Sequence, residues 1–210
     1  MRYDLIIFDF DGTLADSFPF FVAAQNVLAR KHRFREIAPA DVDALRHVSP
    51  RELMRRVGMS RWRLPFVVRD FTRHMREHGH GIGLFEGVDV ALAALHAQGP
   101  TLAIVTSNGH DNCRRILGPA FDRFAHLECD VGIFGKKRRL RRVLKAAGVP
   151  ASHALYVGDT EPDAEAARAA GVDFAAVSWG YGAIEALRMH APAVVLASVG
   201  EIATLNARDR

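Results

Sequence analysis

Cysteine is scarce in this sequence, since Cys113 and Cys129 are the only two in 210 residues. So few cysteines exclude a small secreted scaffold stapled by disulfides, and neither residue stands in a metal-ligand spacing. We therefore expect two reduced thiols. Hydrophobic residues make up 49% of the chain and charged residues 25%, which is typical of an ordinary globular protein with one sizeable core.

Long hydrophobic runs are also missing, because no apolar stretch approaches the ~18 residues of a membrane-spanning helix. The first apolar run, Leu5–Phe8, is too short for a signal peptide, and no small-residue cleavage site follows it. There is no internal repeat and no low-complexity linker. These absences predict a cytoplasmic protein with no membrane partner.

The net charge of +4 is concentrated in one part of the chain. Between Ser17 and Gly83 there are 13 Lys and Arg against 6 Asp and Glu, a balance of +7, which leaves −3 for the rest. Such an excess can attract nucleic acid, a membrane surface or a small anion. The basic run Lys136–Arg142 contains no stacking aromatic residue, so we expect a small anion and no nucleic acid.

From Phe85 onward, short apolar runs alternate with helical patterns. The apolar runs are nearly continuous, as in strands buried on both faces of a parallel sheet: Thr101–Thr106, Ala154–Val157, Phe174–Val177 and Val194–Leu196. A helical seam between two of them runs from Leu140 to Ala147 and is closed by Gly148. Alternating strands and helices predict an α/β fold with a doubly wound parallel sheet.

Residues 17–83 have a different pattern, with helical stretches and no clear strand between them: Phe20–Ala29, Pro39–Leu45, Pro50–Val57 and Pro65–His78. Met59–Trp62 is expected to be a loop among these helices. The sequence thus predicts a small helical cap domain, residues 17–83, inserted after the first strand. The α/β core domain would consist of residues 1–16 and 84–210.

Acidic residues follow two of the predicted strands. Leu5–Phe8 leads into Asp9-Phe10-Asp11-Gly12-Thr13, and Ala154–Val157 leads into Gly158-Asp159-Thr160-Glu161-Pro162-Asp163. Alone, the first could be an Asp-Gly turn and the second a capped helix start. Ligands bind at the carboxyl ends of parallel strands, and Mg²⁺ suits carboxylate oxygens. Two such clusters in one sheet predict a single magnesium site.

Two further segments fit a site for phosphate. Thr106-Ser107-Asn108 follows a strand and offers a hydroxyl and loop amides, although a turn before a helix would look the same. Lys136 opens a predicted helix, where its charge opposes the helix dipole, so we expect it to face a phosphate. The neighbouring cations are expected to form a solvated basic face.

Taken together, these motifs resemble those of a haloacid dehalogenase superfamily phosphatase with a helical cap, and the match covers nearly the whole chain. Asp9-x-Asp11-Gly12-Thr13 resembles the first motif, Thr106 the second, Lys136 the third and Gly158-Asp159-x-x-x-Asp163 the fourth. Leu84–Val88 resembles the return from cap to core. Gly135-Lys136-Lys137 departs from the Lys-Pro of many relatives, which leaves Lys137 as an alternative to Lys136.

The resemblance implies a role for each motif residue. Asp9 would be the nucleophile, and Asp11 would protonate the leaving oxygen and then activate water. Mg²⁺ would be held by Asp9, the backbone carbonyl of Asp11 and Asp159, with Asp163 nearby. Thr106 and Lys136 would hold phosphoryl oxygens. Substrate contacts are expected from Gly12, Thr13, Ser107 and Asn108, and from Ser49 and Arg51 of the cap, with Arg55 close by.

The expected substrate is a small, doubly anionic phosphate ester of the phosphoglycolate kind, because the insert is short and positively charged. Ser178–Gly182 resembles a stretch in phosphoglycolate phosphatase-like proteins, but relatives with other substrates share it. A sugar-phosphate phosphomutase could use the same residues, and a non-catalytic binding protein would be expected to lack a charged motif residue. Dehalogenase chemistry would dispense with the metal and with Asp11. A monomer or a homodimer is expected.

Overall fold

The computed structural model describes residues 3–45, 48, 50–131 and 135–207. Its centre is one parallel sheet of six strands in the order β3-β2-β1-β4-β5-β6. The strands are β1 Leu5–Phe8, β2 Thr101–Val105, β3 Phe124–Glu128, β4 Ala154–Gly158, β5 Asp173–Val177 and β6 Val194–Leu196. The predicted doubly wound α/β fold is confirmed.

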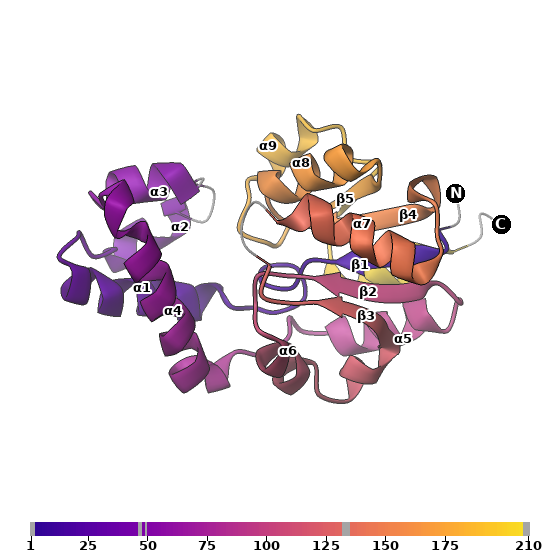
Figure 1. Ribbon diagram of the computed structural model, residues 1–210, viewed down its shortest axis with the longest axis horizontal. Coiled ribbons are helices and arrows are strands. Elements are labelled where there is room, and N and C mark those ends of the chain that lie inside the picture. Colours follow the sequence, from indigo (N-terminus) through magenta and orange to yellow (C-terminus); the bar gives the residue numbers. More distant parts are fainter. Residues whose placement is uncertain (1–2, 46–47, 49, 132–134, 208–210) are drawn as a thin grey trace.

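Helices cover both faces of this sheet (Figure 1). One face packs against α5 Val88–His96, α6 His110–Leu117 and the short 3₁₀ helix η6 Val199–Thr204, and the other against α7 Lys136–Ala147, α8 Glu161–Ala170 and α9 Ile184–Arg188. Along β1, Ile6 and Phe8 point to the first face, while Leu5 and Ile7 point to the second. Both faces are buried, which explains the nearly continuous apolar character of the strands.

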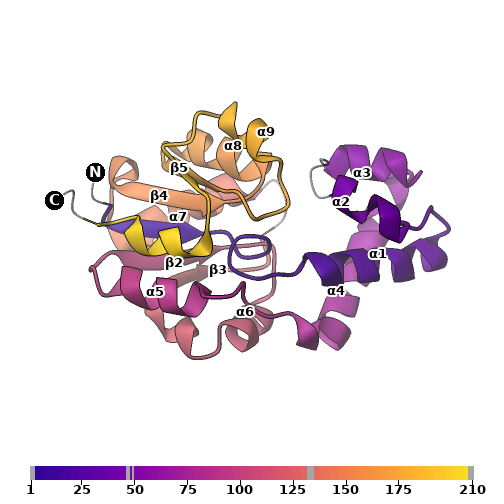
Figure 2. The ribbon, with the colours of Figure 1, turned by 180° about the vertical axis from the view of Figure 1, so that it is seen from behind.

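The helices of residues 18–78 lie beside the sheet rather than over either face, as Figure 1 and, from behind, Figure 2 show. They are α1 Phe18–His32, α2 Val42–Leu45, α3 Pro50–Arg56 and α4 Leu64–His78, with 3₁₀ turns η1 Pro39–Asp41, η2 Arg61–Arg63 and η3 Gly79–Gly81. The two ends of this insert run together, because Asp16 N donates to Gly83 O at 3.0 Å. This pairing supports the division into cap and core, which stays a prediction.

Two local features differ from the sequence-based expectation. Strand β3 was not expected, because its sequence, Phe-Ala-His-Leu-Glu, mixes apolar and polar residues. Among the described strands it lies at the edge of the sheet and pairs with β2 alone, so part of it stays exposed and needs no continuous apolar run. Within the expected loop Met59–Trp62, the chain begins the 3₁₀ turn η2 at Arg61. The connectors η4 Gly118–Arg123 and η5 Ala151–His153 are also 3₁₀ turns.

The strand order reverses at β1, which pairs with β2 on one side and with β4 on the other. In open parallel sheets, such a reversal leaves a crevice at the carboxyl ends of the strands. Asp9 lies there, and its backbone N–H donates to Val157 O of β4 at 2.8 Å. The fold therefore brings the two acidic clusters together. Within the described ranges, no helix combines the length and apolar character needed to cross a membrane.

Candidate active site

Lys136 joins two buried carboxylates of the site. Its Nζ lies 2.9 Å from Asp9 Oδ1 at the end of β1 and 2.5 Å from Asp163 Oδ1 in the first turn of α8. All three side chains are at most 11% exposed. Because Lys136 is the first residue of α7, the helix start places its ammonium group at the carboxyl ends of β1 and β4.

Asp163 has hydrogen-bond donors on both of its carboxylate oxygens. Tyr156 Oη donates to Oδ1 at 2.9 Å, beside Lys136. The backbone N–H of Thr160 donates to Oδ2 at 3.1 Å, and the Thr160 hydroxyl donates to the same oxygen at 2.5 Å. Because donors already occupy both of its oxygens, the Asp163 carboxylate is suited to orienting its neighbours and less suited to direct contact with a metal ion.

Asp159 is fully buried at the end of β4 and is held from two sides. The Thr13 hydroxyl donates to Oδ1 at 3.2 Å, and the backbone N–H of Tyr181 donates to Oδ2 at 2.8 Å. The loop that carries Tyr181 is further fixed because Gly182 N donates to Asp159 O at 3.0 Å. The structure directs the Thr13 hydroxyl to Asp159, and its expected contact with substrate stays a prediction.

Three glycines make room for Asp159. A Cβ on Gly12 would lie 2.3 Å from Asp159 Oδ2, one on Gly180 would lie 2.2 Å from Asp159 Cβ, and one on Gly182 would lie 2.2 Å from Asp159 O. Gly12 also has a φ of +80°, a conformation that other residues rarely adopt. The close approach of two loops to Asp159 therefore depends on residues without side chains.

This packing leads to a prediction for Gly180→Ala. The added methyl group must displace Asp159 or its loop, so we expect a loss of about 1–3 kcal/mol in the free energy of unfolding, together with slower turnover of the phosphate ester that the sequence motifs predict as substrate. Urea denaturation and a phosphate-release assay measure the two effects. The matched control is Gly200→Ala, because a Cβ at Gly200 meets nothing within 4 Å. Equal stability and activity in both variants would contradict the packing argument.

Burial dominates the electrostatics of this site. It raises the pKa of Asp9 well above its usual range, although the attraction to Lys136 acts in the opposite direction. It raises the pKa of Asp159 to about 7, with a further contribution from Asp163. For Lys136, burial acts to lower the pKa, but the attraction of Asp163 and Asp9 outweighs it and the pKa is raised. Lys136 is therefore charged. Its single positive charge does not balance the negative charge of the surrounding carboxylates.

The donor set fits a divalent cation. Asp9, Asp159 and Asp163 each place a carboxylate oxygen within 4.8 Å of the others, and all three residues are buried. Three carboxylates face one ammonium group, so a hard divalent ion would complete the charge balance. The carboxylate of Asp11 is not part of this cluster, and the predicted contact from Asp11 is through its backbone carbonyl.

Asp11 instead interacts with Asn108 and Ser17, two buried polar residues. Asn108 Nδ2 lies 3.2 Å and 3.1 Å from its two carboxylate oxygens. Withdrawal from water raises the pKa of Asp11, while hydrogen bonds from Ser17 and Asn108 lower it in part. The structure places the Asn108 amide on Asp11, and the expected contact of Asn108 with substrate stays a prediction. A carboxyl group with a raised pKa is suited to giving up a proton during a reaction.

The segment after β2 provides Thr106 and Ser107. Thr106 is fully buried, and its hydroxyl accepts a hydrogen bond from Asn108 N at 3.0 Å. Ser107 is exposed. Thr106 lies at the end of β2, next to β1, so it shares the crevice edge with Asp9. The phosphate-binding roles expected for both residues stay predictions.

The other predicted site residues are Lys137 and three residues of the cap. Lys137 is exposed, in contrast to Lys136. Arg55 is exposed and bonded to Glu52, with Nε donating to Oε2 at 2.7 Å. Ser49 lies outside the described residues, and Arg51 is placed in α3 without a described side chain. Among the described side chains, no arginine of the cap contacts the acidic cluster. The role of these arginines in binding substrate stays a prediction.

The sequence pattern indicates no role for Tyr181 or Tyr156, but both contact the site. The Tyr181 hydroxyl shares a hydrogen bond with the Ser17 hydroxyl, and its ring lies 5.3 Å from that of Phe18 between ring centroids. Tyr181 therefore connects the loop around Asp159 to the start of α1. The motif Ser178–Gly182 could have pointed to the loop that carries Tyr181. Tyr156 lies within a buried strand, and no sequence motif marks it.

The sequence is similar to a known protein family and to individual relatives within it. The pattern of haloacid dehalogenase-like hydrolases matches residues 6–177. A phosphoglycolate phosphatase of Synechococcus elongatus is 35% identical over 84% of both chains. A 5′-nucleotidase of Pseudomonas aeruginosa is 32% identical over 91% of this chain and 90% of its own.

Among solved structures, a haloacid dehalogenase-like family hydrolase from Streptococcus pneumoniae superimposes with a TM-score of 0.82. It covers 96% of this chain and 97% of its own at 19% sequence identity, so it supports the fold alone. Because the family pattern matches most of the sequence and a relative of 35% identity covers 84% of both chains, this chain belongs to the haloacid dehalogenase-like hydrolases.

Proposed function

We propose that this protein is a magnesium-dependent phosphatase that removes the phosphoryl group from a small phosphate ester through an aspartyl-phosphate on Asp9. The observation that carries the proposal is the position of Asp9, next to the ammonium group of Lys136 and within the cluster that contains Asp159 and Asp163. A carboxylate beside fixed positive charge can approach an anionic phosphate, which would otherwise repel it.

In the first half of the reaction, a carboxylate oxygen of Asp9 attacks phosphorus and the bond to the ester oxygen breaks. Asp11 gives its proton to that leaving oxygen, so an alcohol departs. The raised pKa of Asp11 supports this role, because burial favours the protonated form of this carboxyl group more than in an exposed aspartate. The side-chain amide of Asn108 holds the Asp11 carboxyl group in place.

In the second half, the Asp11 carboxylate accepts a proton from water, and the resulting hydroxide attacks the phosphorus bound to Asp9. The bond between phosphorus and Asp9 breaks, which releases inorganic phosphate and restores both residues. Lys136 and Thr106 are proposed to hold phosphoryl oxygens in both halves. Mg²⁺, held by Asp9, the backbone carbonyl of Asp11 and Asp159 with Asp163 behind them, would offset the negative charge of the site and of the phosphoryl group.

The proposed substrate class is a small phosphate ester of the phosphoglycolate kind. The similarity to the Synechococcus elongatus phosphoglycolate phosphatase supports this class. The helical insert also has a balance of +7 between Ser17 and Gly83, which suits a doubly anionic substrate. The similarity to a 5′-nucleotidase makes a nucleoside monophosphate the natural comparison.

The test is a comparison of kcat/KM for phosphoglycolate, glucose 6-phosphate and adenosine monophosphate, measured as release of inorganic phosphate with Mg²⁺ present. We expect phosphoglycolate to be preferred by at least about tenfold, which corresponds to roughly 1.4 kcal/mol of selective binding. A preference for the nucleotide would contradict the proposed substrate class. If no ester releases phosphate, the phosphatase proposal itself is wrong.

A matched pair of lysine variants separates Lys136 from its neighbour. Lys136→Met removes the charge next to Asp9, and we expect kcat/KM to fall by about 10²-fold or more because stabilisation of the transition state is lost. Lys137→Met removes the same charge from an exposed side chain and should retain activity near that of the wild type. The opposite result would make Lys137 the phosphate-binding lysine.

A further inference from the structure

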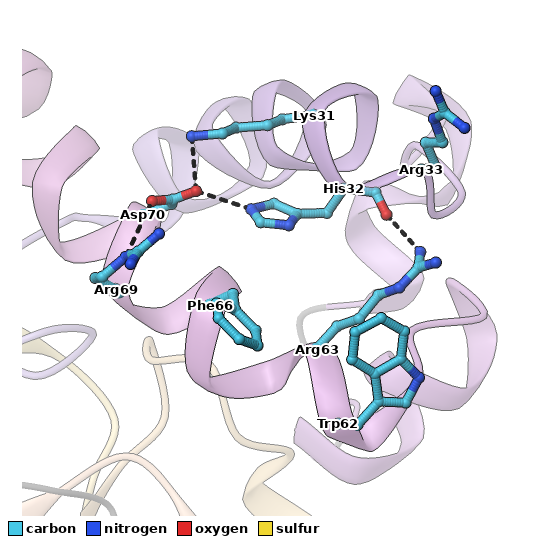
Figure 3. A pocket seen from close by; sticks show the side chains of 8 residues that line it. All are labelled: Lys31, His32, Arg33, Trp62, Arg63, Phe66, Arg69 and Asp70. Atoms are coloured by element: carbon cyan, nitrogen blue, oxygen red, sulfur yellow. Dashed lines mark hydrogen bonds and ion pairs between the residues drawn. The ribbon is translucent and has the colours of Figure 1, made fainter.

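Part of the positive charge of residues 17–83 lines a hollow away from the acidic cluster. This hollow, here called the cap hollow, has a volume of about 450 Å³ and forms where the end of α1 meets η2 and the start of α4 (Figure 3). The 15 residues of α1 rise by about 1.5 Å each, so its last turn lies ~20 Å from Ser17, which borders Asp11. The cap hollow is therefore separate from the candidate active site.

The cap hollow carries an excess of positive charge. Its lining includes four permanent cations, Lys31, Arg33, Arg63 and Arg69, and the one acid in that lining is Asp70. Asp70 is already engaged, because Lys31 Nζ lies 2.7 Å from its Oδ2, while Arg73 donates to its Oδ1 at 2.9 Å and Arg69 Nε lies 3.5 Å from the same oxygen. The hydrogen bond from Lys31 helps to hold the pKa of Asp70 at about 2. One acid shared by several cations leaves charge for an external anion.

Two aromatic rings of the cap hollow face solvent. Trp62 is 68% exposed and Phe66 is 49% exposed. In Figure 3, both rings lie on one side of the hollow, and Lys31 and His32 lie on the other. Each ring has a guanidinium group close by, since Arg63 lies 4.9 Å from the Trp62 centroid and Arg69 lies 5.9 Å from the Phe66 centroid. Exposed rings beside cations suit a ligand that has both a planar ring and negative charge.

From this combination of charge, rings and volume, we propose that the cap hollow binds a nucleoside polyphosphate. The base would stack on Trp62, the more exposed of the two rings, and the phosphates would pair with Arg33, Arg63 and Arg69. The volume falls within the ~300–1,000 Å³ of typical small-molecule sites. Stacking accepts any base, so the site should depend on the number of phosphates more than on the base.

The experiment is a calorimetric titration of the full chain with the non-hydrolysable ATP analogue adenosine 5′-(β,γ-imido)triphosphate in EDTA. Without metal, the carboxylates of the active site repel the triphosphate, so binding reports on the cap hollow. We expect the affinity to fall at least ~10-fold in Trp62→Ala and in Arg69→Gln, because stacking and ion pairing are lost. Trp62→Phe, which keeps a ring, should restore binding.

Two control variants change exposed residues of the same insert that do not line the cap hollow. Arg56→Gln removes a cation of α3 that is paired with Glu52, and Val68→Ala truncates an exposed apolar side chain of α4. Both should bind the analogue as the wild type does, and a thermal melt of every variant checks that it is folded.

Three results would overturn the proposal: no binding by the wild type, equal binding by Trp62→Ala, or binding of tripolyphosphate or a short polyglutamate peptide as tightly as the nucleotide analogue. Because the titration measures binding alone, its outcome is independent of the activity proposed above.

Discussion

Asp9→Asn is expected to lower kcat/KM for a phosphate ester by at least ~10³-fold, the size of effect typical for loss of an essential group. The amide has nearly the shape of the carboxylate but cannot attack phosphorus, so the covalent step fails. Phosphate release by the purified variant at saturating Mg²⁺ measures the loss. Activity within tenfold of the wild type would exclude an aspartyl-phosphate on Asp9.

The control for this variant is Asp122→Asn, which makes the same chemical change at an exposed residue of η4. It should keep full activity. Asp9→Asn also weakens the contact of Lys136 with residue 9, but Lys136 retains Asp163 at 2.5 Å, so we expect the variant to stay folded. A cooperative thermal melt of Asp9→Asn separates loss of chemistry from loss of structure.

Removal of divalent metal by EDTA is expected to lower activity by at least ~10²-fold, because the stabilisation that a metal ion gives to developing charge amounts to several kcal/mol. Addition of Mg²⁺ should restore the activity. The physical reason is the cluster of Asp9, Asp159 and Asp163, whose charge Lys136 alone does not offset. Full activity after exhaustive EDTA treatment would contradict metal dependence.

The same site predicts how pH changes the metal requirement. Burial raises the pKa of Asp159 to about 7, so protons compete with the metal below that pH. The concentration of Mg²⁺ that gives half-maximal activity should therefore increase as the pH falls from about 8 to about 6. Asp159→Asn should raise that concentration at least ~10-fold at constant pH, since a charged ligand is lost. Glu161→Gln, an exposed acid at the start of α8, is the control and should leave it unchanged.

Much of the core architecture could be predicted from local sequence alone. Strands buried on both faces must be apolar throughout, so β1, β2, β4, β5 and β6 were visible as short continuous runs. Glycines with left-handed backbone end α7 and α8, at Gly148 and Gly171, because they have no Cβ to clash. In parallel sheets, functional residues gather at strand ends, which made Asp9 and Asp159 recognisable candidates.

Only the tertiary structure decided how the side chains share the site. Tyr181 lies 22 residues after Asp159, and its backbone N–H reaches the Asp159 carboxylate only because the loop after β5 folds back over β4. Likewise, Arg55 is engaged with Glu52, and the cations of the cap hollow gather far from Asp9, although all of them contribute equally to the charge count of the sequence. Periodicity and composition describe the residues of one segment and do not indicate which distant residues they contact. The partner of each charge depends on contacts between distant segments, which form only when the chain packs.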